Sequence, residues 1–176
     1  MASGDTIYHG AYTSFVPEAT GTPGASDQLG ATYDGFSRGL SFPPKVSCGA
    51  YAVLRLPANA SLATGATVKL LVADDPLNSI AGKAVVIGVN FGLLGTSSAY
   101  VAPAAAALGT EATVTVTMPS TAGQTMEVSI PIVVANMASA AASKWVLFRI
   151  RRLGANSSDT GTLGRLMVLG VTVLDT

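Results

Sequence analysis

The residues best able to do chemistry in this sequence are few and lie far apart. Among 176 residues there is one histidine, His9, and one cysteine, Cys48. A catalytic triad or a histidine-based metal site needs several suitable side chains that converge on one place. The sequence also has no phosphate-binding glycine loop, no nucleophile elbow and no paired histidines at metalloprotease spacing. We therefore predict no catalytic residue, no cofactor and no bound metal, and we expect Cys48 to be a small buried hydrophobe.

Asp74, Asp75 and Asn78 carry oxygen atoms that could hold a calcium ion. The ligand spacing of an EF-hand and its closing glutamate are missing, however. The alternative is a turn at the end of a strand, in which aspartate side chains cap the backbone and Pro76 stops the strand. We expect the turn.

The composition limits the partners that this chain can have. Charged residues make up 11% of the chain, against about 25% in ordinary globular proteins. The ten basic and ten acidic residues cancel, which argues against nucleic acid or an anionic membrane as the main partner. A surface of small polar and apolar residues is covered by another protein at a low desolvation cost, since no ion has to leave water.

No stretch of sequence approaches the roughly 18 apolar residues of a membrane helix. The first residues lack the basic start and apolar stretch of a secretion signal, so we expect synthesis and folding in a cytoplasm. The single cysteine excludes an internal disulfide.

From residue 40 onward, apolar and polar residues alternate with the period of β-strands. Two alternating runs flank the turn PSTAGQ, which predicts an antiparallel hairpin. Pro131 cannot donate a backbone hydrogen bond, so its strand is expected at an edge or at a bulge. The fold predicted is all-β, an antiparallel two-sheet sandwich of jelly-roll type, with helix at most in PAAAAL and NMASAAAS. The expected strands are 50–57, 66–73, 84–92, 112–118, 125–134, 144–152 and 164–174, with an eighth near 40–46.

Residues 1–39 differ from the rest because they are rich in Gly, Ser, Thr and Pro and show no sustained apolar period. We predict an extended N-terminal arm over 1–39 and a β-sandwich domain over 40–176. Six of the eleven aromatic residues lie in the arm or just after it, where Phe42 follows. Rings that anchor an arm bury on its own domain or on a neighbouring subunit. We expect a neighbour, so that removal of 1–39 leaves the sandwich folded. The candidate contact residues of the arm are Tyr8, Tyr12, Phe15, Tyr33 and Phe36.

A second candidate contact surface is the cationic cluster Arg149, Arg151 and Arg152, with Lys144 and Arg165 nearby. Strand alternation places Arg149 and Arg151 opposite Phe148. Guanidinium groups pair with carboxylates through a planar fork, which suits a salt-bridge surface between subunits. A nucleic-acid patch is disfavoured by the balanced charge, whereas an ordinary solvated strand face stays equally open.

The segment FRIRRLGANSSDTGTLGRLMVLGVTVL, residues 148–174, resembles the closing hairpin of small virion proteins of tailed bacteriophages. The plan of a Gly/Thr-rich arm before an alanine-rich sandwich of few charges is similar to that of phage head decoration (cement) proteins. This resemblance implies a non-enzymatic structural protein that binds the major capsid protein and stabilises the head. It also implies a homo-oligomer, a dimer or a trimer, on the capsid exterior, made in the host cytoplasm.

Two other kinds of function remain open. One is another virion component, such as a head fibre, a tail or baseplate adaptor, or a sugar-binding receptor module. Sugar binding needs exposed aromatics beside carboxylates and amides, and the sole tryptophan, Trp145, lies in an apolar strand. The other is a glycoside hydrolase, which needs two carboxylates about 5 to 10 Å apart. Within the strand region only four carboxylates are candidates for such a pair, namely Asp74, Asp75, Glu111 and Glu127.

Overall fold

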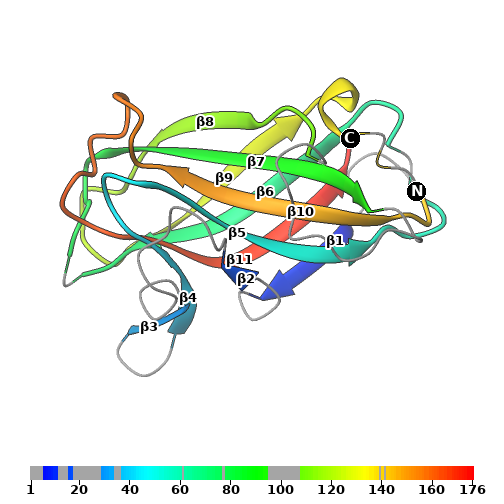
Figure 1. Cartoon of the computed structure of the whole chain (residues 1–176). Coiled ribbons are helices and arrows are strands. Elements are labelled where there is room, and N and C mark those ends of the chain that lie inside the picture. Colours follow the sequence, from blue (N-terminus) through cyan, green and yellow to red (C-terminus); the bar gives the residue numbers. More distant parts are fainter. Residues whose placement is uncertain are drawn as a thin grey trace.

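The chain folds into two antiparallel β-sheets that stack face to face, and Figure 1 shows their strands crossing at an angle. The computed structural model describes residues 6–11, 16–17, 29–33, 37–60, 62–76, 78–94, 108–138, 140 and 142–176. The strands are β1 (Thr6–Ala11), β2 (Val16–Pro17), β3 (Leu29–Tyr33), β4 (Ser37–Phe42), β5 (Ser47–Arg55), β6 (Ala66–Asp74), β7 (Ala84–Leu94), β8 (Ala112–Thr117), β9 (Thr125–Ile132), β10 (Trp145–Leu153) and β11 (Leu166–Asp175).

The larger sheet has the order β3-β4-β11-β6-β9, with β1 also paired to β11. The smaller sheet has the order β2-β5-β10-β7-β8. The predicted antiparallel two-sheet sandwich is confirmed. All seven strands expected from alternation are present, with ends that differ by up to three residues, and the eighth is β4.

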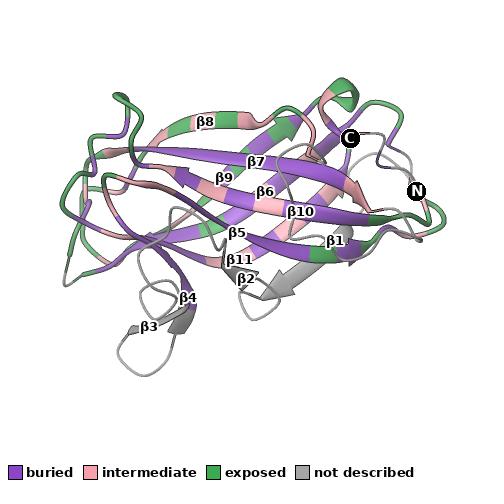
Figure 2. Cartoon of the chain, viewed as in Figure 1, coloured by how far each residue is buried: buried purple, intermediate pink, exposed green. Residues whose placement is uncertain are grey.

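Side chains from the inner faces of both sheets form one continuous core. The central strands contribute Val68, Leu70 and Val72 from β6 and Val85, Ile87 and Val89 from β7, all of them buried. In Figure 2 the middle strands β7 and β10 are mostly purple, whereas β8 is green and pink. Removal of this apolar surface from water drives the two sheets together. Cys48 lies in the same core, as predicted for a buried hydrophobe.

The predicted hairpin between residues 112–118 and 125–134 is wrong. β8 pairs with β7 and β9 pairs with β6, so the connection PSTAGQ passes from one sheet to the other. Alternation reports which face of a strand is buried but not which strand lies beside it, and a short turn suits either arrangement. Both strands are at the edges of their sheets, which confirms the edge position expected for Pro131.

The described parts of residues 1–39 belong to the sheets of the same chain. β1 pairs with residues 170–174 of β11, β2 pairs with Tyr51 and Ala50 of β5, and β3 pairs with β4. The expected boundary between residues 39 and 40 falls inside β4, which pairs with residues 166–168 of β11. One edge of β11 is thus shared by β4 and β1. We expected the arm to depend on a neighbouring chain because we assumed that the strands after residue 40 complete both sheets. The pairing of β1, β2 and β3 within the same chain shows that this assumption does not hold.

Helix is scarce, as expected. The helical element among the described residues is a single 3-10 turn, Val134–Asn136, at the start of the second alanine-rich run. The first run, at residues 103–108, lies outside the described residues except for Leu108. Within the described ranges, no helix is long and apolar enough to cross a membrane.

Candidate functional site

The outward face of the sheet β5-β10-β7-β8 carries the candidate site. Along β10, Val146, Phe148 and Ile150 point into the core, so the residues between them point outward. Arg149 is therefore on the outer face, as the sequence predicted. Its register partners are Tyr51 on β5 and Asn90 on β7, which share this face with it.

Five polar residues meet there, and we call Tyr51, Asn90, Glu111, Arg149 and Arg151 the outer-face cluster. The Nε of Arg149 donates a hydrogen bond to Oδ1 of Asn90 at 3.0 Å. The Glu111 carboxylate lies between the two arginines, with Oε1 3.7 Å from Nη2 of Arg149 and Oε2 3.6 Å from Nη1 of Arg151. These ion-pair distances exceed those of ordinary N–H···O hydrogen bonds, so the glutamate is held by charge more than by directed contacts.

The cluster is largely withdrawn from water. Asn90 is 2% exposed, and its Nδ2 donates to the carbonyl oxygen of Gly109. The charged side chains are half-buried, at 19% exposed for Glu111, 12% for Arg149 and 24% for Arg151. Charges interact more strongly at such sites than on an open surface, because less water screens them. The arrangement can orient a polar ligand through several donors and acceptors of fixed geometry.

The same face continues into an exposed apolar region at the start of β10. Trp145 lies in the outward phase of the strand and is 45% exposed, and its register partner Arg55 on β5 is also exposed. Val53, two residues before Arg55, is exposed as well. Trp145 does lie in the apolar strand expected for it, but its side chain occupies an outward position at the strand end and is exposed.

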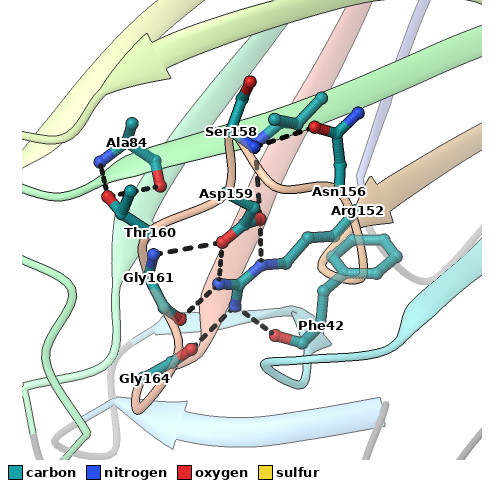
Figure 3. Close-up of polar contacts among 10 residues, drawn as sticks. Phe42, Ala84, Arg152, Asn156, Ser158, Asp159, Thr160, Gly161 and Gly164 are labelled. Atoms are coloured by element: carbon teal, nitrogen blue, oxygen red, sulfur yellow. Dashed lines mark hydrogen bonds and ion pairs between the residues drawn. The ribbon is translucent and has the colours of Figure 1, made fainter.

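Arg152 is not part of this surface. It has the inward phase of β10 and is fully buried, and Figure 3 shows its polar contacts. Its Nε and Nη2 donate to the two carboxylate oxygens of Asp159 at 2.9 and 2.8 Å. Further donations reach the carbonyl oxygens of Phe42, Gly161 and Gly164. The predicted contact surface of three arginines is thereby reduced to Arg149 and Arg151.

Asp159 completes this internal network. Its carboxylate also accepts hydrogen bonds from the backbone N–H groups of Gly161 and Val86. Beside it, Thr160 exchanges hydrogen bonds with the backbone of Ala84, as Figure 3 shows. The connection between β10 and β11 is in this way fixed to the start of β7.

The structure says less about the aromatic contact residues predicted for the arm. Tyr8 lies in β1 opposite Val173, and Tyr33 lies in β3 opposite Ser37. Their side chains are not among the described ones, and Tyr12, Phe15 and Phe36 lie outside the described residues. A contact role for these five residues stays a prediction.

Asp74, Asp75 and Asn78 form the predicted turn. The N–H of Asn78 donates to the carbonyl oxygen of Asp75, and the Asp74 carboxylate accepts from the hydroxyl of Ser79 and the N–H of Gly123. Among the described residues, no three His, Cys, Asp or Glu side chains gather in a way that could hold a metal ion.

The two glutamates weighed as hydrolase residues lie on different sheets. Glu127 is on the outside of the larger sheet, where it pairs with Lys69 at 2.8 Å, and Glu111 is on the smaller sheet. They therefore do not face each other across a common site.

Comparison with known proteins supports the fold. No family model matches this sequence, and no curated protein matches it either. Among solved structures, an arabinose-bound α-L-arabinofuranosidase superposes with a TM-score of 0.55 at 10% identity, over 92% of this chain and 23% of the enzyme. The xylan-binding domain CBM22-2 of Xyn10C from Paenibacillus barcinonensis has a TM-score of 0.50 at 12% identity, covering 97% and 99%.

A third similar structure is the CBM22-1–GH10 portion of xylanase 10B from Clostridium thermocellum, solved with xylohexaose. Its TM-score is 0.50 at 12% identity, over all of this chain and 29% of the other. This chain therefore spans about a quarter of each of the two enzymes and nearly the whole xylan-binding domain. At such identities the likeness establishes a shared β-sandwich fold.

Proposed function

We propose that this chain is a non-catalytic glycan-binding module whose ligand lies on the outer face of the sheet β5-β10-β7-β8. The observation that carries the proposal is the exposed Trp145 on the same face as the outer-face cluster. An exposed aromatic ring on the same face as an amide, a carboxylate and guanidinium groups is a combination suited to sugar recognition.

The chemistry of a sugar ring matches this combination. One face of the ring carries C–H bonds that stack on an indole, while its hydroxyl groups exchange hydrogen bonds with polar side chains. Trp145 and Arg149 are four positions apart along an extended strand, a spacing of about 13 Å. A single sugar is too short to reach both, so the ligand is an oligosaccharide or polysaccharide that runs along β10.

The fold is compatible with this role. The similar domain from Paenibacillus barcinonensis is a xylan-binding domain, and the Clostridium thermocellum modules were solved with xylohexaose. A non-catalytic role is supported by the separation of Glu111 and Glu127 and by the use of Asp74 in a turn. These are the residues from which the strand region could have built a hydrolytic pair.

The virion setting is a further part of the proposal and rests on the resemblance of residues 148–174. In that setting, a glycan-binding sandwich would be a receptor-binding component on the outside of the particle. The alternative is a head decoration protein that binds the major capsid protein as a dimer or trimer, which the low charge of the chain favours.

Cryo-electron microscopy of the source particle tells these two roles apart. We expect the domain at a fibre, tail or baseplate with the outer face of β10 directed away from the particle. A regular array over the capsid, with that face turned toward the major capsid protein, would contradict the receptor role and support decoration.

Replacement of Trp145 by alanine is expected to weaken glycan binding at least about tenfold, because exposed aromatics that anchor a ligand dominate its binding free energy. Isothermal titration calorimetry with xylohexaose, arabinoxylan and bacterial lipopolysaccharide measures the affinity. The matched control is Leu163→Ala, which removes an exposed apolar side chain that lies after the other end of β10. Failure of the wild-type chain to bind any of these glycans, or equal affinity of Trp145→Ala and wild type, would contradict the proposal.

A further inference from the structure

One oxygen in the outer-face cluster lacks a hydrogen-bond partner. Oε1 of Glu111 is buried and accepts no hydrogen bond within the part of the chain that the structure describes. Nη2 of Arg149 lies 3.7 Å from this oxygen, which is too long for a hydrogen bond. A buried acceptor without a donor is costly, and the cost is larger when the group is charged.

The backbone of β7 makes this resting position possible. The Glu111 side chain lies across Gly88, and a Cβ atom at Gly88 would come within 2.6 Å of Cδ and 2.9 Å of Oε1. Any side chain larger than hydrogen at this position would therefore push the carboxylate off β7. Glu111 itself lies just before β8 and can turn its side chain without any change in a paired strand.

We propose that Glu111 is the specificity-determining acceptor of the glycan site and that its carboxylate leaves Gly88 to accept a ligand hydroxyl. This inference rests on the proposed function. In the free protein the carboxylate is held over Gly88 by two long ion pairs and one oxygen has no donor. In the complex a sugar O–H supplies that donor, and the two arginines continue to balance the charge.

The preferred ligand follows from this chemistry. A carboxylate is an acceptor only, so it selects groups that donate a hydrogen bond. A sugar with a free hydroxyl at this position binds, whereas the same sugar with that hydroxyl acetylated has no proton to donate and leaves the carboxylate unpartnered. The site is therefore expected to prefer deacetylated over O-acetylated forms of the same polysaccharide.

The first test compares Glu111→Gln with wild type by calorimetry on deacetylated and O-acetylated xylan. Wild type is expected to bind the deacetylated polymer at least about tenfold more tightly, and Glu111→Gln is expected to lose most of that preference, because the hydrogen bond to a charged acceptor is gone. The matched control is Glu127→Gln, which removes a paired carboxylate on the outside of the other sheet and should leave both affinities unchanged. A preference that persists in Glu111→Gln would overturn the inference.

The second test is Gly88→Ala. This variant keeps the Glu111 carboxylate, but the added Cβ prevents the carboxylate from lying over β7. If Glu111 acts on the ligand after leaving Gly88, this variant keeps its affinity or gains some, since the acceptor is already displaced outward. A loss beyond about threefold would mean that the carboxylate acts from over Gly88, and the proposed movement would be wrong.

Trp145→Ala separates a failure of this inference from a failure of the glycan-binding function. Suppose that wild type binds xylan, that Trp145→Ala does not, and that Glu111→Gln binds like wild type. The glycan-binding function is then supported, and the proposed role of Glu111 is contradicted. If wild type binds none of the glycans tested, both the glycan-binding function and the role of Glu111 are contradicted.

Discussion

Replacement of Arg152 by methionine is expected to lower the free energy of unfolding by about 3 to 5 kcal/mol. The side chain is fully buried and donates to both oxygens of Asp159 and to three backbone carbonyl oxygens. Methionine fills similar space but donates nothing, so a buried carboxylate loses its counter-charge and the carbonyls lose their donor. A domain of this size has a total stability of about 5 to 15 kcal/mol, so the variant would be close to unfolding.

Lys69→Met is the matched control for this prediction. The Lys69–Glu127 ion pair has the same N–O distance of 2.8 Å as the shortest Arg152–Asp159 pair, but both of its side chains are open to solvent. Its removal is expected to change stability by less than about 1 kcal/mol. Urea unfolding midpoints, with an unchanged slope, measure both variants. Equal losses in the two would show that burial of the Arg152 pair adds nothing to the stability of the fold.

Removal of residues 1–39 is expected to abolish cooperative folding or to lower the melting temperature severely. The deletion takes away β1, β2 and β3 and the first part of β4, so the edge of β11 that faces β1 and β4 loses most of its pairing. Its backbone N–H and C=O groups then lie unpaired beside a core that includes Val171 and Val173. This expectation reverses the one from composition alone, in which the arm was dispensable.

Hydrogen exchange on the full-length chain tests the same point without truncation. Backbone amides of residues 170–174 should be protected at protein concentrations low enough to exclude oligomers, and to a degree near that of the β7 amides in the other sheet. A truncated chain that melts at the same temperature as the full-length protein would contradict the pairing. It would support the earlier expectation that the arm contacts a neighbouring subunit.

The strands were predictable because a period of two is a local property that each strand carries by itself. Pairing is not local. The partners of β11 are β6, β4 and β1, which lie roughly a hundred residues or more before it, and nothing in its own residues specifies them. The β8–β9 error has the same origin, since a six-residue turn closes a hairpin or bridges two sheets equally well.

The site was predictable in part for a related reason. Alternation gave the outward phase of Arg149 and Arg151, and the same rule places Trp145 outward and Arg152 inward. The role of Glu111 depends on Gly88, 23 residues before it, and on Arg149 and Arg151, which lie 38 and 40 residues after it, all of them on other strands. An isolated glycine in an alternating strand was the available signal, because it marks close approach of another group.

The separation of β8 and β9 into different sheets also bears on how the molecule behaves when crowded. Each is the last strand of its sheet, so within the described residues the outer backbone groups of both are left without a strand partner. A second molecule could add its own edge there and continue the sheets into a fibril. Proline at position 131 interrupts the donor row of β9, and the charged Glu127 points outward from the same strand. An edge strand that carries a proline and a charged side chain is a poor template for such pairing, a property separate from folding and from recognition of any ligand.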